Sequence, residues 1–152
     1  MIRRNSMKIS TRARYGSRLM LELALYYGQK AVLLKDIAKN EEISEKYLSQ
    51  IIIPLKAAGL VNSYRGAHGG YVLAKAPDQI SLKDIVEILE GGLDLLSCVG
   101  NGAVCNRTSI CATRDIWSLL GEKISQTLNS ITLKDLVNIH KEKEEKVLMY
   151  NI

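Results

Sequence analysis

The fold is decided by residues 43–74, which read ISEKYLSQIIIPLKAAGLVNSYRGAHGGYVLA. Ser44 carries a hydroxyl that can cap the N-terminus of a helix, and Gly59 is a residue type that commonly ends one. The first part therefore predicts a helix from Ser44 to about Ala58. The rest predicts a β-hairpin, with strand-like runs at 60–64 and 71–74 and a Gly-rich turn at 65–70 between them.

Within that helix, apolar residues recur at the spacing of one buried face: Leu48, Ile51, Ile52 and Leu55. Pro54 lacks a backbone N–H and predicts a kink or an early break. Two further helices are expected upstream, from residues 10–11 to about Gln29 and over 34–39. Helix, turn, helix and β-hairpin is the order of a winged helix-turn-helix, so the expected fold is mainly α with a small β-hairpin wing.

Helices also dominate the prediction beyond the hairpin. Ser81 with Asp84, and Thr132 with Asp135, each place a hydroxyl three residues before an acid, which predicts two more helix starts. Between them, a helix over about 113–130 carries an apolar stripe: Ile116, Leu120, Ile124 and Leu128, followed by Ile131. We expect this stripe to pack against a second copy of the chain in a homodimer, the alternative being that it folds back onto its own domain. The expected organisation has three parts. Residues 7–90 form a winged helix-turn-helix domain, residues 91–112 a cysteine-containing loop that binds a cofactor, and residues 113–145 a long dimerisation helix with a C-terminal helix.

The composition narrows the function further. No apolar run in the 152 residues approaches the ~20 residues of a membrane span. Residues 1–6 lack the apolar segment of a signal peptide, and Met7 is an alternative start, so we expect a cytoplasmic protein with no membrane partner. Residues 1–75 contain 13 Lys and Arg against 5 Asp and Glu, whereas residues 76–152 contain 8 against 11. This asymmetry indicates an N-terminal half that faces a polyanion, although a solvated basic surface gives the same pattern.

A winged helix-turn-helix binds double-stranded DNA by placing the N-terminal end of its second helix in the major groove. Gln50 can pair with adenine there, and Arg65 at the tip of the wing can enter the flanking minor groove. The arginines of the first helix are expected to contact phosphates: Arg12, Arg14 and Arg18. The expected DNA-contact residues are Arg12, Ser44, Lys46, Tyr47, Ser49, Gln50, Arg65 and Gly66.

All three cysteines of the chain lie in one Gly-containing segment: Cys98, Cys105 and Cys111, spaced C-x6-C-x5-C. Three thiols cannot all pair in disulfides, and clustered thiolates are the donors that a soft metal or an iron–sulfur cluster requires. The spacing matches neither structural zinc nor ferredoxin patterns. We interpret the cysteines as a cofactor site, with free redox thiols or plain buried cysteines as alternatives. With 2 histidines in separate segments and no nucleophile–base arrangement, the sequence does not indicate an enzyme.

The chain resembles the IscR/NsrR family of winged-helix regulators over nearly all of residues 7–140. The matching stretches are MKISTRARY from residue 7, ISEKYLSQ from 43, LVNSYRG from 60, GGY from 69 and ITL from 131. The three cysteines match as well. The resemblance implies a homodimeric DNA-binding regulator in which three cysteines per subunit hold an iron–sulfur cluster. It also implies operator contacts from the wing arginine, here Arg65, and from the helix that starts at Ser44. The matching positions in that helix are Ser44, Lys46, Ser49 and Gln50.

Two departures from the family concern the cluster ligands. The first cysteine interval is one residue longer than the family usually has, which a Gly-containing loop can absorb. IscR proteins carry a histidine ligand three residues after the last cysteine, where this chain has Arg114, and NsrR proteins use an N-terminal carboxylate of the partner subunit, where it has Arg14. A guanidinium does not ligate iron. The fourth ligand therefore stays open, and with it the choice of a [2Fe–2S] or [4Fe–4S] cluster; the candidates are Asp115, Glu22, His140 and a small exogenous ligand.

The sequence thus predicts a homodimeric transcriptional regulator whose operator binding responds to iron–sulfur status, oxygen or nitric oxide through this cluster. One alternative is a thiol- or zinc-responsive repressor that uses the same cysteines without a cluster. Another is an interaction protein that docks on a cysteine- or cluster-assembly enzyme.

Overall fold

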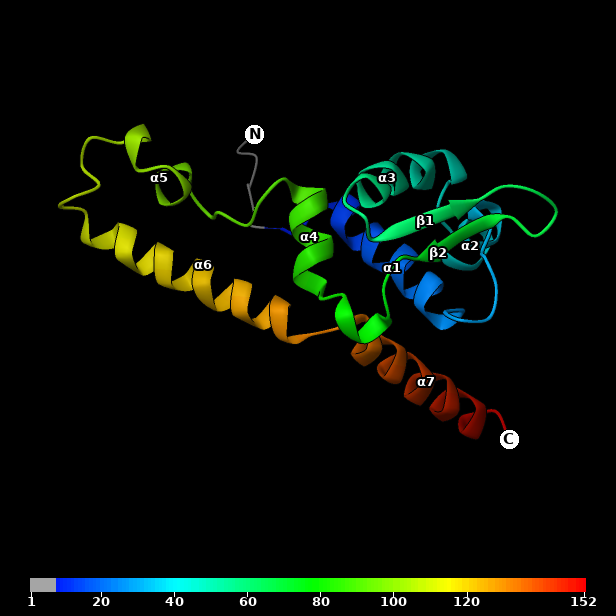
Figure 1. Cartoon of the computed structure of the whole chain (residues 1–152). Coiled ribbons are helices and arrows are strands. Elements are labelled where there is room, and N and C mark those ends of the chain that lie inside the picture. The colour runs from blue at the N-terminus through cyan, green and yellow to red at the C-terminus, as the bar shows by residue number, and fades with distance from the viewer. Residues whose placement is uncertain (1–7) are drawn as a thin grey trace, which may run out of the picture.

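The computed structural model describes residues 8–152, so the alternative start at Met7 and the interpretation of residues 1–6 lie outside it. Helix α1 (Thr11–Leu25) begins where predicted, because the Ser10 hydroxyl accepts a hydrogen bond from the Ala13 N–H at 3.1 Å. It ends earlier than the predicted Gln29, and the following residues form a turn instead. Helix α2 (Leu34–Glu41) follows and packs against α1 (Figure 1).

Helix α3 (Glu45–Ala57) is the second helix of the helix-turn-helix, and the Ser44 hydroxyl caps it by accepting the Tyr47 N–H at 3.0 Å. The predicted buried face is confirmed, since its four apolar residues belong to the core: Leu48, Ile51, Ile52 and Leu55. An early break at Pro54 does not occur, and the helix continues to Ala57. Proline removes one hydrogen bond near the end of α3, whereas Ile52 and Leu55 near it are packed in the core.

Strands β1 (Val61–Tyr64) and β2 (Gly70–Leu73) form the antiparallel wing, with Val61 opposite Leu73. The segment before α2 joins them through an isolated bridge between Val32 and Tyr71. Gly70 permits this approach, because its φ is +138° and a Cβ on it would lie 2.7 Å from the Val32 carbonyl oxygen. The wing is therefore attached to the helices beside it.

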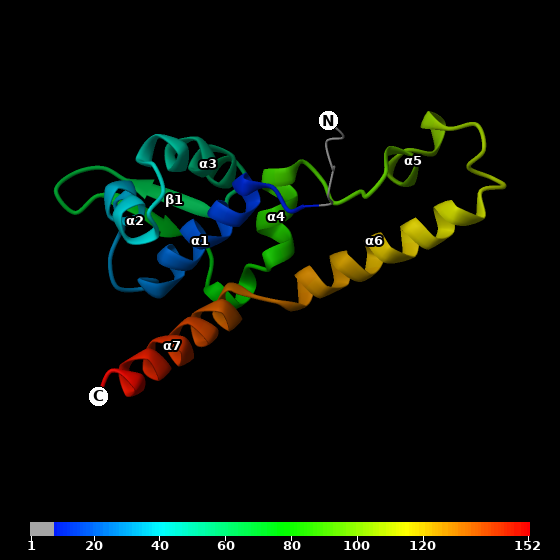
Figure 2. The ribbon, with the colours of Figure 1, turned by 180° about the vertical axis from the view of Figure 1, so that it is seen from behind.

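Helices α4 (Leu82–Glu90) and α7 (Leu133–Tyr150) begin at the two predicted capping boxes. A short 3-10 turn (Pro77–Gln79) connects the wing to α4. Helix α4 packs across α1, and the first half of α7 packs on α1 with Leu133 and Val137 buried (Figure 2). We call α1 to α4 with the wing the head; one hydrophobic core joins it to the start of α7.

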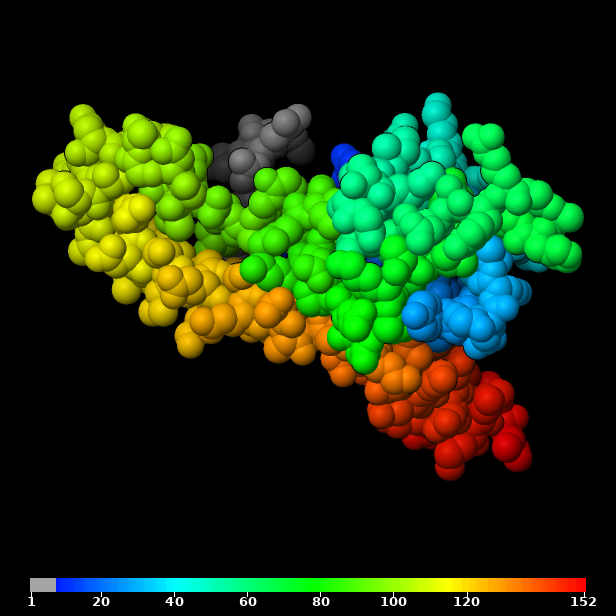
Figure 3. Space-filling model, in the orientation of Figure 1, coloured from blue at the N-terminus to red at the C-terminus, as the bar shows by residue number. Residues whose placement is uncertain are grey.

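Helix α5 (Ser97–Gly100), a 3-10 turn (Gly102–Val104) and helix α6 (Ala112–Ser130) form an arm that extends from the head (Figures 1 and 3). No residue of α6 is buried. Leu128 packs at the edge of the core, whereas Ile116 and Leu120 are exposed, so the head covers the predicted apolar stripe only toward its C-terminal end. Among residues 8–152, no helix combines the length and apolar character needed to cross a membrane.

Candidate DNA interface and cysteine loop

The N-terminal end of α3 presents most of the residues that were predicted to contact DNA. Ser44, Lys46 and Gln50 are exposed, whereas Ser49 and Tyr47 are half-buried. The Ser44 oxygen accepts the Tyr47 N–H, and the Ser49 hydroxyl donates to the Lys46 carbonyl at 2.7 Å. These bonds order the first turns, so α3 presents a polar end of fixed shape to solvent.

The three arginines of α1 are not equivalent. Arg12 and Arg14 are exposed, and within residues 8–152 neither side chain makes a hydrogen bond or an ion pair. The Arg18 guanidinium instead binds Glu41 at the end of α2. Arg12 and Arg14 are thus available to an external anion, whereas Arg18 is already bound to the protein.

The wing places Arg65 in its exposed turn, beside Gly66 with a φ of +109° that favours glycine. Lys56, near the end of α3, donates to the Ser63 hydroxyl at 2.7 Å, and its Nζ lies 6.0 Å from the centre of the Tyr71 ring. Lys56 therefore links the wing to α3, and Arg65 lies in the turn that follows strand β1.

Within the predicted segment 91–112, residues 98–111 run from α5 to the start of α6, and we call these residues the cysteine loop. Cys98 lies in α5, Cys105 follows the 3-10 turn, and Cys111 is the N-cap residue of α6. All three cysteines are free and half-buried. The Arg114 Nε donates to the Cys98 carbonyl oxygen at 2.9 Å, so the two ends of the loop meet at the first turn of α6.

The environment of Cys111 favours its thiolate. Its pKa is lowered by a hydrogen bond with the Thr113 hydroxyl, at 3.3 Å, and by the backbone N–H of Arg114. Thiolates are the form of cysteine that binds iron. Within residues 8–152, no three His, Cys, Asp or Glu side chains are grouped as a metal ion requires. The chemistry of the donors fits a cluster, and binding one requires the cysteine loop to draw its three thiols together.

The three candidate fourth ligands from the protein lie in different places. Asp115 is exposed in the first turn of α6, one turn after Cys111. Glu22 is on α1 and His140 on α7, and both helices lie across the molecule from α5 (Figure 1). Glu22 is buried and accepts a hydrogen bond from Asn40 at 3.2 Å. Within one chain, Asp115 is therefore the protein candidate that lies beside the loop.

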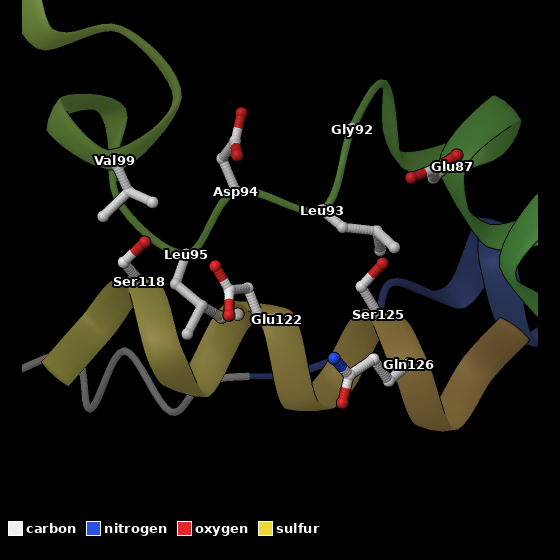
Figure 4. Close-up of a pocket in the computed structure, with 11 residues that line it drawn as sticks. Glu87, Gly92, Leu93, Asp94, Leu95, Val99, Ser118, Glu122, Ser125 and Gln126 are labelled. Atoms are coloured by element: carbon white, nitrogen blue, oxygen red, sulfur yellow. The ribbon is translucent and has the colours of Figure 1, made fainter. Parts of the chain in front are cut away.

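A cavity of about 570 Å³ lies between α4, the linker 92–95, α5 and α6 (Figure 4). Several of its lining side chains are acidic or polar: Glu87, Asp94, Glu122, Ser118 and Ser125. The sequence did not predict this cavity, because its walls come from these four separate elements. The cavity is partly open to solvent where the arm meets the head.

A helix-turn-helix followed by a β-hairpin wing defines the class of winged-helix regulators. Residues 9–139 match the family model of Rrf2, which is described as an iron-dependent transcriptional regulator. The chain belongs to the Rrf2 family.

Relatives and solved structures agree with this assignment. The HTH-type transcriptional regulator CymR of Bacillus subtilis is 39% identical over 144 residues, which cover 95% of this chain and 99% of CymR. IscR of Erwinia tasmaniensis is 38% identical over 132 residues, which cover 87% of this chain and 79% of IscR. The structure of B. subtilis CymR has a TM-score of 0.75 at 40% identity and covers 88% of this chain and 98% of its own. T. potens IscR has a TM-score of 0.75 at 38% identity and covers 91% of both chains.

These comparisons confirm the predicted winged-helix fold and the resemblance to IscR. They also make the chain a transcriptional regulator rather than an enzyme, because the family and its relatives are regulators.

Proposed function

We propose that this Rrf2-family regulator is a homodimer whose binding to operator DNA is controlled by an iron–sulfur cluster on Cys98, Cys105 and Cys111. The observation that carries the proposal is the presence of three free, half-buried thiols on one loop that leads directly into α6. The description of the family as iron-dependent and the relatives named IscR support it. We expect the regulator to act in the reducing cytoplasm, where such thiols stay unpaired.

The proposed operator surface is formed by the exposed end of α3, the wing and the start of α1. Lys46 and Gln50 would reach the major groove, Arg65 the flanking minor groove, and Arg12 a phosphate. The full proposed contact set is Arg12, Ser44, Lys46, Ser49, Gln50, Arg65 and Gly66. Tyr47, which the sequence analysis also placed in this set, is half-buried and packs against the Tyr15 ring, so we propose no direct contact for it.

Arg65→Ala tests this surface. Losing the wing contact is expected to weaken binding by about tenfold, the scale of one specific contact. The probe is a duplex that the wild-type protein selects from a random-sequence pool, with affinity measured at one fixed salt concentration. Lys75→Ala, which changes an exposed lysine outside the proposed surface, is the matched control. Equal affinities of Arg65→Ala and the wild-type protein would contradict wing insertion.

We propose one function for each of three segments: residues 7–90 bind DNA, residues 91–112 hold the cluster, and residues 113–145 associate with the second chain. The exposed apolar residues of α6 support the association role, because large uncovered apolar surfaces commonly mark interfaces. A bound cluster would supply a redox-sensitive and labile group. Because Cys111 caps α6 and Arg114 bonds to the Cys98 carbonyl, a rearranged cysteine loop would act on the first turn of α6. The cavity leaves α6 room to tilt, which in a dimer would alter the spacing of the two heads.

Anaerobic purification tests the cluster. The wild-type protein is expected to be coloured, with iron and acid-labile sulfide in amounts that match its cysteine sites. A variant with all three cysteines changed to serine is the matched control and is expected to be colourless. Mössbauer spectroscopy of the loaded protein then distinguishes [2Fe–2S] from [4Fe–4S]. A wild-type protein without iron or sulfide after reconstitution would contradict the proposal.

A second candidate is a thiol-responsive regulator, with or without zinc, that binds no cluster. One observation favours it: the structure of CymR, a relative 39% identical over 95% of this chain, is described as that of the global cysteine regulator of B. subtilis. Metal analysis separates the candidates, because the second predicts zinc or no metal. It also predicts that a thiol oxidant changes DNA binding of the iron-free wild-type protein but not of the triple serine variant.

A further inference from the structure

Arg18 ties α1 to the C-terminal end of α2. Its Nε binds the Glu41 carboxylate, and its Nη2 donates to the Glu41 carbonyl oxygen at 2.6 Å. Glu41 is the last residue of α2, so this carbonyl has no partner within the helix. A guanidinium bound to one residue at two points is held in a single orientation. Arg18 therefore fixes the end of α2, from which residues 42–44 lead directly into α3.

The same guanidinium begins an aromatic chain that reaches α3. The Arg18 Cζ lies 5.6 Å from the centre of the Tyr15 ring. The Tyr15 and Tyr47 rings meet edge to face, with their centres 5.9 Å apart and their planes at 84°. Tyr47 is in the first turn of α3, where its N–H is bound by the Ser44 cap. Side chains from α1 thus hold both sides of the turn between α2 and α3.

We infer that these four residues, Tyr15, Arg18, Glu41 and Tyr47, form a turn clamp that positions the start of α3 for operator recognition. The inference rests on the proposed DNA-binding function and refines it. Arg18 and Tyr47 act here through the protein, not by contacting phosphates or bases. Groove contacts need the polar end of α3 in one orientation, and fixing that orientation before binding reduces the entropy lost on association.

The salt dependence of DNA affinity separates positioning from phosphate contact. Each phosphate contact contributes about −0.9 to the slope of log K against log salt concentration. On the selected duplex, Arg12→Gln is expected to make this slope shallower by about 1. Arg18→Gln is expected to weaken binding by about tenfold at fixed salt while keeping the wild-type slope. A slope change like that of Arg12→Gln would show that Arg18 contacts a phosphate and would overturn the inference.

Glu41→Gln tests the sign of the effect with almost no change in shape. If only charge mattered, removing a negative charge near DNA would strengthen binding. The turn clamp requires the opposite, because Arg18 loses its ionic partner. The double variant Arg18→Gln/Glu41→Gln is expected to lose no more affinity than Arg18→Gln alone, since Arg18→Gln already breaks the contact with the Glu41 carboxylate. Tighter binding by Glu41→Gln, or additive losses, would overturn the inference.

Substitutions at Tyr47 separate the role of its ring from that of its hydroxyl. Tyr47→Phe keeps the edge-to-face contact and is expected to bind like the wild-type protein, whereas Tyr47→Leu is expected to bind more weakly. An equal loss in both variants would show that the hydroxyl contacts DNA. Thermal unfolding of each variant checks that the fold is kept. If the wild-type protein bound no duplex even at low salt, the proposed function itself would be contradicted; a changed slope for Arg18→Gln contradicts the turn clamp alone.

Discussion

At the scale of single residues, Glu22 is a carboxyl group in an apolar core. Its side chain on α1 is only 6% exposed and accepts a hydrogen bond from Asn40 of α2. Burial raises its pKa, and the Asn40 bond opposes this effect. The folded protein therefore holds this proton more tightly than the unfolded chain does. Its stabilising contribution is present below the ordinary pKa of glutamate, 4.5, and is lost as the pH rises through the raised value.

Glu22→Gln is expected to be more stable than the wild-type protein at neutral pH, because glutamine keeps an acceptor for Asn40 and cannot ionise. The difference in free energy of unfolding is expected to shrink as the pH falls toward 4.5. Urea unfolding at several pH values measures it. Asp78→Asn, which changes an exposed carboxylate, is the control and is expected to have little effect. A constant difference across this range would mean that the ionisation of Glu22 is not its source.

A second prediction concerns Arg114 and depends on the proposed cluster. This residue stands where IscR proteins have a histidine ligand, and it binds the Cys98 carbonyl instead. Arg114→His supplies an imidazole nitrogen at that position, so the cluster is expected to persist longer in air than in the wild-type protein. The decay of visible absorbance measures its lifetime, and Arg114→Gln is the control for loss of the Cys98 contact. If Arg114→His decays at the wild-type rate, the fourth ligand comes from elsewhere.

At the scale of elements, hydroxyl caps fix where four of the described helices begin: α1, α3, α4 and α7. The Ser81 side chain accepts the Asp84 N–H at 3.1 Å, and the Asp84 carboxylate accepts the Ser81 N–H at 2.9 Å. Ser81→Ala is therefore expected to lower the free energy of unfolding by about 1 kcal/mol. Urea unfolding measures the loss, with Ser109→Ala on the exposed loop as control. A loss within the roughly 0.5 kcal/mol range of surface substitutions would mean that the cap contributes little.

Helix starts could be predicted because their signals are local: Ser44 stands directly before the helix that it caps. The end of α1 was misplaced, since no breaker stands at Leu25, and the continuation of α3 past Pro54 depends on the core around it. The spacing of the cysteines indicated a shared site. The sequence carried no information on the bond from Arg18 to Glu41 or on the cavity walls, because tertiary packing brings those residues together.

At the scale of the whole molecule, the head and the cysteine loop lie at opposite ends of the arm (Figure 2). Leu133 and Val137 bury the start of α7 against the head, and the Ile131 carbonyl accepts the Leu82 N–H at 2.7 Å. The C-terminal end of α6 is thus anchored, whereas its N-terminal end follows the loop. A rigid helix held at one end turns a local change at the other into a rotation, which is a geometry suited to signalling between distant sites.

The association of two chains through α6 is the last prediction. Ile116 is 61% exposed and Leu120 is 38% exposed, and neither belongs to the core of its own chain. Leu120→Glu would bring charges together across a homodimer interface, so the variant is expected to sediment as a folded monomer. Asn129→Glu, at an exposed position on the opposite face of the same helix, is the control and is expected to stay dimeric. Because a monomer reads only one half-site, its affinity for the selected duplex is expected to fall by about 100-fold. A Leu120→Glu variant that remains dimeric would show that another exposed apolar surface joins the subunits, such as Val147 and Leu148 near the end of α7.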